Sequence, residues 1–253
     1  MRRTLIVPAA GLGSRLRAAA PKALVPVGGR PMIDHLIGLT SPHVQHVVVV
    51  AHPSFSAAVR DHLARTWPHV SCDVIEQQQP TGMLDAILLA TPAVTRSDAE
   101  NIWIVWCDQV GILPATLARL AAASSSPPLP DLVVATVWRT DPYIHFDRDE
   151  EGRIVRVRQR REGDEMPPQG ESDMGLFALS RAAFLSQLPT YATDVAPGRG
   201  TGERNFLPFI PWIASSGTVV TIPATDPLEA LGINTPEDLA AVERWLRERH
   251  APA

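Results

Sequence analysis

Short apolar runs alternate along this chain with segments in which apolar residues recur every three or four positions. The runs predict strands, and the segments between them predict amphipathic helices, one of them with Ser54 as its cap. The predicted strands cover residues 4–9, 44–51, 70–76, 101–107 and 131–138, and the predicted helices cover residues 31–39, 54–66, 81–90 and 113–123. This alternation is typical of an α/β, Rossmann-like, doubly wound and mostly parallel sheet with helices on both faces.

The pattern changes after about residue 140. Three short strands are predicted at residues 143–149, 152–159 and 174–180, which indicates a small β lid insertion over about residues 140–180. A strand at 217–224 and a helix at 235–250 close the chain. We therefore expect one domain over residues 1–253, with Trp103 and Trp138 among the core residues of its strands.

Composition narrows the choice of partners. The formal net charge is −4, whereas nucleic acids and anionic membranes are normally met by a clearly basic face. No apolar stretch approaches the roughly 20 residues of a membrane-spanning helix. The two cysteines, Cys72 and Cys107, lie far apart, which suits a reducing compartment. These observations predict a cytoplasmic protein that binds neither nucleic acid nor a membrane, and they leave a homo-oligomer open.

A glycine-rich loop follows the first predicted strand. Small residues around Gly11 and Gly13 let backbone amides approach and surround a phosphate group. The dinucleotide-binding pattern is only half matched, because Leu16 stands where a third small residue is needed. Two cations follow the loop, Arg15 and Lys22, and Lys22 is the single lysine in a chain with 23 basic residues. This arrangement favours a phosphate site that uses both a planar guanidinium and a compact ammonium.

Six segments together carry a resemblance to a known family. "PAAGLGSRL" followed by "PKALVPVGGRPMIDHLI" closely resembles the signature of the nucleotidyltransferase superfamily that makes nucleotide sugars, including the pyrophosphorylase domain of N-acetylglucosamine-1-phosphate uridyltransferase. "EQQQPTGMLDAI", "VWCDQV", "ESDMGLFALS" and "GINTPEDLAAVERWL" are similar to later motifs of that superfamily, in the same order. The resemblance covers most of the chain and implies an enzyme of the nucleotidyltransferase class.

The resemblance also implies site residues. Arg15 and Lys22 are the implied catalytic residues, Asp108 and Asn234 the implied metal ligands, and Mg²⁺ the implied cofactor, for which an all-oxygen ligand set is suited. The implied nucleotide-binding residues are Ala9, Ala10, Gly11, Gly13, Gln77 and Gly82, and the implied acceptor-binding residues are Asp173, Gly175 and Gln159. The start Ala9-Ala10-Gly11 is more similar to the uridylyl and cytidylyl branches, which favours UTP or CTP.

The acceptor segments depart from the uridyltransferase pattern. Ile144 replaces a glycine, Gln159 or Arg158 stands near the place of a glutamate, and Asp173 takes the place of an asparagine. Four arginines lie close together at Arg156, Arg158, Arg160 and Arg161. They predict either an acidic acceptor or, as we favour, an edge strand protected by its charges.

We therefore expect an Mg²⁺-dependent enzyme that transfers a nucleotidyl group from a nucleoside triphosphate to a small phosphorylated acceptor, a sugar-1-phosphate, and releases pyrophosphate. One alternative is a cytidylyltransferase for a phosphorylated alcohol or a phosphonate, because the acceptor segments depart from the sugar pattern. The alternative from another class is a non-catalytic nucleotide-sugar sensor or scaffold. Retention of Arg15, Lys22, Asp108 and Asn234 argues against the sensor.

Overall fold

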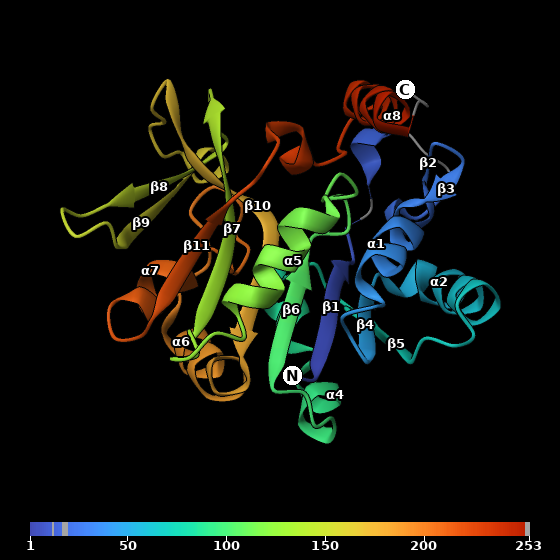
Figure 1. The fold of residues 1–253 in the computed structure, drawn as a ribbon, viewed down its shortest axis with the longest axis horizontal. Coiled ribbons are helices and arrows are strands. Elements are labelled where there is room, and N and C mark those ends of the chain that lie inside the picture. The colour runs from blue at the N-terminus through green and yellow to red at the C-terminus, as the bar shows by residue number, and fades with distance from the viewer. Residues whose placement is uncertain (12, 17–19, 251–253) are drawn as a thin grey trace.

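A seven-stranded sheet forms the centre of the computed structural model, which describes residues 1–11, 13–16 and 20–250 (Figure 1). The strand order is β11-β7-β10-β6-β1-β4-β5, and only β10 is antiparallel to its neighbours. The strands are β1 (Arg3–Ala9), β4 (His46–Ala51), β5 (Cys72–Glu76), β6 (Asn101–Val105), β7 (Leu132–Thr140), β10 (Gln169–Ser180) and β11 (Val219–Pro223). The prediction of a mostly parallel, doubly wound α/β fold is confirmed.

Helices cover both faces of this sheet. They are α1 (Met32–Thr40), α2 (Pro53–Thr66), α3 (Met83–Leu88), α4 (Thr91–Arg96), α5 (Pro114–Ala123), α6 (Leu188–Asp194), α7 (Phe209–Ala214) and α8 (Pro236–His250). Short helical turns lie at η1 (Ser14–Leu16), η2 (Lys22–Leu24), η3 (Arg160–Glu162), η4 (Ala183–Gln187) and η5 (Pro227–Ala230). Two small sheets, β2 (Pro26–Val27) with β3 (Arg30–Pro31) and β8 (Ile144–Arg148) with β9 (Ile154–Gln159), complete the described fold.

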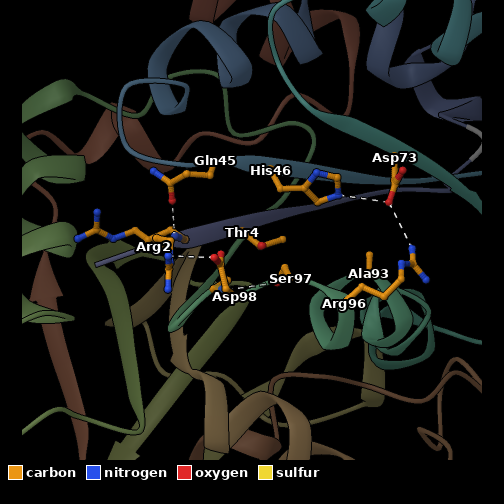
Figure 2. Close-up of a pocket in the computed structure, with 11 residues that line it drawn as sticks. Arg2, Thr4, Gln45, His46, Asp73, Ala93, Arg96, Ser97 and Asp98 are labelled. Carbon is orange, nitrogen blue, oxygen red and sulfur yellow. Dashed lines mark hydrogen bonds and ion pairs between the residues drawn. The ribbon is translucent and has the colours of Figure 1, made fainter.

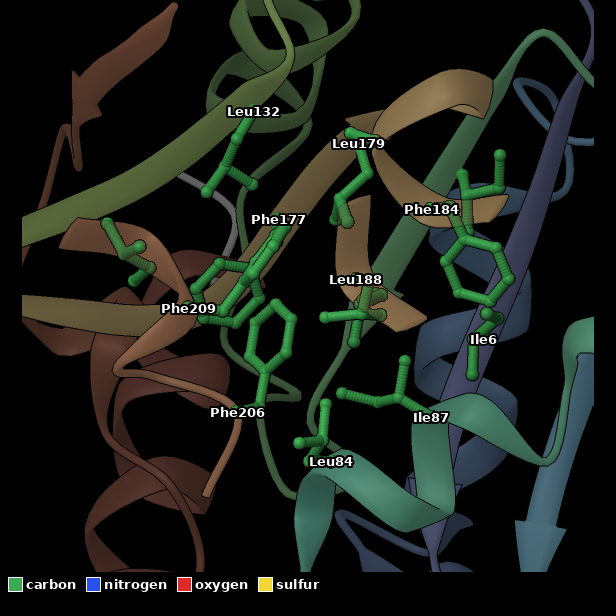
Figure 3. Packing of buried hydrophobic residues seen from close by; sticks show 14 of the residues in the cluster. Ile6, Leu84, Ile87, Leu132, Phe177, Leu179, Phe184, Leu188, Phe206 and Phe209 are labelled. Carbon is green, nitrogen blue, oxygen red and sulfur yellow. The ribbon is translucent and has the colours of Figure 1, made fainter. Parts of the chain in front are cut away.

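Side chains of each strand divide between two apolar cores. Along β1, Ile6 points into one core, whereas Leu5 and Val7 point into the other, as strand geometry requires. The first core is rich in aromatic rings, and Figure 3 shows Phe177 and Phe206 packed together in it. Because both faces are covered, the strands read as continuous apolar runs in the sequence.

Three local predictions differ from the structure. The predicted strand 174–180 is the second half of β10 in the central sheet, so the separate sheet contains β8 and β9 alone. Trp138 is not a core residue but 65% exposed, whereas its neighbour Val137, on the opposite face of β7, is 4% exposed, so only one face of this end of β7 is covered. Helix α2 is capped by the His52 ring, which accepts from Ser54 N, so the serine is not the cap.

Across the described residues, no helix combines the length and the apolar character that a membrane crossing requires.

Candidate active site

Three polar side chains from distant parts of the chain meet beyond the carboxyl ends of β1 and β6. The Lys22 ammonium donates to Asp108 Oδ2 at 2.6 Å and to Asn234 Oδ1 at 2.9 Å. The Lys22 and Asp108 side chains are only 15% and 16% exposed, so water screens their ion pair weakly. The structure thus brings together the predicted catalytic lysine and both predicted metal ligands.

Backbone hydrogen bonds fix the segment that carries Asn234. Ile233 N donates to the Asp108 carbonyl oxygen at 3.2 Å. The N–H groups of Asn234 and Thr235 donate to Asp238 Oδ2 at 3.0 and 2.9 Å. Asp238 lies in the first turn of α8, where a carboxylate satisfies free N–H groups. The start of this helix therefore sets the position of Asn234 opposite Asp108.

Glu229 is fully buried and holds the turn that precedes this segment. Its Oε2 accepts from Leu113 N at 2.9 Å, and its Oε1 accepts from Thr225 N at 2.9 Å, Thr225 Oγ1 at 2.6 Å and Asp226 N at 3.0 Å. Both carboxylate oxygens are thus occupied by protein donors. Glu229 is a structural loop residue that ties η5 to the loop before α5.

The predicted phosphate loop begins directly after β1, which ends at Ala9. Gly13 has a φ of +62°, and a methyl group built on it would lie 3.2 Å from Lys22 Cβ, so glycine permits both the turn and the close approach of the lysine. The guanidinium of Arg15 donates through Nη2 to Asn234 Oδ1 at 3.3 Å. Both predicted catalytic cations therefore converge on Asn234.

Gln77 and Gly82, the predicted nucleobase-reading pair, are joined directly. Gln77 Nε2 donates to the Gly82 carbonyl oxygen at 3.1 Å, and Gln77 N donates to the Ala51 carbonyl oxygen at 3.0 Å. Gly82 has a φ of +124°, and any side chain there would overlap the backbone of Arg204. The turn before α3 therefore requires glycine for its conformation and for space.

The predicted acceptor residues Asp173 and Gly175 form a bulge in β10, at the point where its register to β7 shifts. Gly175 has a φ of +71°, its N–H donates to Asp173 Oδ2 at 2.9 Å, and its carbonyl oxygen accepts from Trp106 N at 2.9 Å. Trp106 lies two residues before Asp108, so the bulge adjoins the loop that carries Asp108. The third predicted acceptor residue, Gln159 on β9, is 4% exposed, and its buried Oε1 has no hydrogen-bond partner within the described part of the chain.

Burial raises the pKa of Asp173 to about 6, against the opposing effects of the Gly175 N–H and the charge of Arg139. The folded protein therefore holds this proton more tightly than the unfolded chain, and the free energy of unfolding should fall as the pH rises from about 4 to about 6. Because Asp173→Asn removes the ionisation, we expect it to stabilise the protein by up to about 3 kcal/mol near neutral pH. Urea unfolding measured below and above this range tests the expectation.

The matched control is Asp98→Asn, whose side chain is 68% exposed. It should change stability little at either pH. An equal effect of Asp173→Asn at both pH values would contradict the assignment, because the neutral acid and the amide differ little in hydration.

Every arginine of the cluster has a carboxylate partner. The pairs are Arg156 with Asp164 at 2.7 Å, Arg158 with Asp147 at 2.7 Å, Arg160 with Asp141 at 2.5 Å and Arg161 with Glu203 at 3.3 Å. These contacts neutralise the basic face, so the structure favours a charge-protected edge strand over a site for an acidic acceptor.

Glu162 ties the end of the β8–β9 hairpin to residues 198–205. Its carboxylate accepts from Gly200 N at 2.8 Å, Thr201 Oγ1 at 2.7 Å and Asn205 Nδ2 at 3.0 Å. Burial works in the opposite direction, yet these hydrogen bonds lower the pKa of Glu162 to about 2. Because Arg204 in the same loop pairs with Asp85 of α3 at 2.5 Å, the hairpin is linked to the turn at Gly82.

A cavity of about 300 Å³ lies at the other end of the strands, near the amino ends of β1 and β4. Figure 2 shows its charged groups paired with one another, Arg2 with Asp98 at 2.9 Å and Asp73 with both His46 at 3.2 Å and Arg96 at 3.7 Å. The cavity therefore lies at the amino ends of the strands, whereas Lys22 lies beyond their carboxyl ends.

Comparison with known proteins identifies the family of the chain. The family of MobA-like NTP transferase domains matches residues 5–201. The chain belongs to this family. It is a nucleotidyltransferase, an enzyme with a Rossmann-like α/β fold in the superfamily of sugar-1-phosphate nucleotidyltransferases.

Relatives of this nucleotidyltransferase include three proteins named bifunctional protein GlmU. The protein of Aromatoleum aromaticum is 31% identical over 95% of this chain and 51% of its own length, and that of Alkalilimnicola ehrlichii is 31% identical over 98% and 51%. The protein of Solibacter usitatus is 28% identical over 97% and 52%. The chain thus spans about half the length of these curated relatives.

Two residues near the site of this nucleotidyltransferase were missed by sequence reasoning. Arg139 on β7 donates to the Ala230 carbonyl oxygen and lies close to Asp173. Gln109 follows Asp108 and lies between the acceptor bulge and Asn234. Adjacency to Asp108 was the available signal for Gln109, whereas no local pattern marks Arg139, which reaches a segment 91 residues away.

Proposed function

We propose that this nucleotidyltransferase uses Mg²⁺ to transfer a nucleotidyl group from UTP or CTP to a sugar-1-phosphate and releases pyrophosphate. The observation that carries the proposal is the position of the Lys22 ammonium between Asp108 and Asn234, next to a glycine-rich phosphate loop. Sugar-phosphate substrates are expected for relatives of GlmU, and the GlmU proteins are similar to nearly all of this chain. This similarity supports a sugar-phosphate acceptor.

The residues present fit a divalent cation. The carboxylate of Asp108 and the carboxamide oxygen of Asn234 already converge on one cation, the Lys22 ammonium. Such oxygen donors suit Mg²⁺, which retains several water ligands and bridges to phosphates. When bound there, the metal would neutralise charge on the triphosphate.

In the proposed reaction, a phosphate oxygen of the acceptor attacks the α-phosphorus of the triphosphate. The new P–O bond forms as the bond between the α-phosphorus and the bridging oxygen breaks, and pyrophosphate carries away that electron pair. Lys22 would contact oxygens of both the acceptor phosphate and the α-phosphate, and Arg15 would hold the triphosphate tail. The protein therefore acts by aligning anions and neutralising their repulsion.

A second candidate is transfer from CTP to a phosphorylated alcohol or a phosphonate. Ile144 and Asp173 favour it, because both depart from the pattern of the uridyltransferases. The unpartnered carboxamide oxygens of Gln159 and Gln109 favour the sugar, because they match an acceptor with several hydroxyl donors.

Pyrophosphate release tests the proposal. The protein is incubated with Mg²⁺ and each nucleoside triphosphate in turn, together with sugar-1-phosphates in one set and phosphorylated alcohols and phosphonates in another. We expect release with UTP or CTP and a sugar-1-phosphate, with the product identified by mass spectrometry. Release only in the second set supports the second candidate. Tight binding of a nucleotide sugar without release from any pair would indicate a sensor and contradict both.

A further inference from the structure

Gln109 occupies the space between the acceptor bulge and the predicted metal ligands. A methyl group built on Gly232 would lie 3.0 Å from Gln109 Nε2, 3.4 Å from Asn234 Nδ2 and 3.4 Å from Asp108 Cγ. On the other side, a methyl group built on Gly175 would lie 2.8 Å from Gln109 Cγ. The two glycines leave room for this side chain, and its carboxamide lies beside the groups that hold Lys22.

The carboxamide of Gln109 lacks protein partners among the described residues. The residue is 7% exposed, and its fully buried Oε1 accepts no hydrogen bond. Its backbone N–H is satisfied by the Trp106 carbonyl oxygen at 3.0 Å, so the deficit belongs to the side chain alone. A buried amide without a partner destabilises the free protein, and an apolar side chain of similar size would avoid that cost.

We propose that Gln109 binds the acceptor, with Oε1 accepting a hydrogen bond from an acceptor hydroxyl and Nε2 donating to an oxygen of the acceptor phosphate. This inference rests on the proposed function, because it assumes that the acceptor lies between Asp173 and Lys22. A hydroxylated phosphate ester satisfies a group that can both donate and accept, whereas an acceptor without hydroxyl groups leaves Oε1 unpaired. Gln109 therefore selects for a hydroxyl group near the acceptor phosphate.

Gln109→Met separates this role from a structural one. Methionine keeps the length of the side chain and removes both polar groups. We expect the urea midpoint of the free protein to stay the same or rise, because an unpaired buried amide is lost. We expect kcat/KM for the acceptor to fall about 10- to 100-fold, since a buried hydrogen bond to substrate is lost, with KM for the nucleotide unchanged.

Gln187→Met is the matched control. Gln187 lies in η4, away from the site, and its buried Oε1 is also unpartnered. This variant should leave kcat/KM for the acceptor unchanged. If Gln109→Met keeps its acceptor kcat/KM within about twofold, or loses stability and activity together, the inference is wrong and the proposed function stands. If the unaltered protein releases pyrophosphate from no pair, the proposed function fails and the inference fails with it.

Discussion

Lys22→Met is expected to reduce nucleotidyl transfer by roughly a thousandfold or more and to leave the fold intact. Among the described residues, the ammonium is the only side-chain group that donates hydrogen bonds to both Asp108 and Asn234, at 2.6 and 2.9 Å. In the reaction it would neutralise two phosphates that repel each other, and methionine offers no charge in its place. Pyrophosphate release under saturating triphosphate, followed with circular dichroism to verify folding, measures the effect.

The same variant should bind a divalent metal more tightly when no nucleotide is present. In the free protein Lys22 lies where a metal bound to Asp108 and Asn234 would lie, so ammonium and metal compete for the same oxygens. Titration with Mn²⁺, followed by electron paramagnetic resonance, would show this gain independently of catalysis. Weaker Mn²⁺ binding in Lys22→Met would refute the competition.

Two variants serve as controls for Lys22. Lys22→Arg keeps the charge but places it on a broad planar fork, so we expect a loss of at least about tenfold. Arg96→Met removes a 70% exposed cation at the remote cavity and should change little. Full activity of Lys22→Met would show that this lysine is not catalytic.

Asp108→Asn is expected to lower transfer by a similar factor, about a thousandfold, because the proposed metal ligand loses its charge. It also leaves the partly buried Lys22 ammonium without its anion, which should lower the free energy of unfolding by roughly 1–3 kcal/mol. Activity measured against Mg²⁺ concentration, together with urea unfolding, tests both effects. Added Mg²⁺ should restore only part of the rate, because the asparagine oxygen is a weaker ligand than a carboxylate.

Asp98→Asn is the control for this change as well, because it removes an exposed carboxylate paired with Arg2 and lies away from the site. It should retain its rate and its Mg²⁺ dependence. An Mg²⁺ optimum that is the same in Asp108→Asn as in the unaltered protein would remove Asp108 from the metal site.

Local sequence was sufficient for the parallel strands of the sheet and for two loop glycines. β1, β4 and β6 are continuous apolar runs because both of their faces are buried, and a run of that kind is visible without the fold. Gly13 and Gly82 could be identified as loop residues because their backbone conformations favour glycine.

Local sequence could not place the last predicted lid strand or Trp138. A strand buried on both faces looks the same in a lid as in the central sheet, and only pairing with β6 and β7 assigns residues 174–180 to β10. The exposure of Trp138, beside the buried Val137, depends on which face of β7 other segments cover. The neutralisation of the four arginines likewise depends on carboxylates from four other segments.

The sequence by itself determined the alternation of strands and helices and the family, and it predicted Lys22, Asp108 and Asn234 as site residues, since each of these is encoded in a short run of neighbouring residues. The tertiary structure alone decided that Lys22 meets Asp108, 86 residues away, and Asn234, 212 residues away. It alone decided that Gln109 is buried without a partner between Gly175 and Gly232. Side-chain burial and hydrogen bonding depend on segments that meet only when the parallel strands align their carboxyl ends at one edge of the sheet.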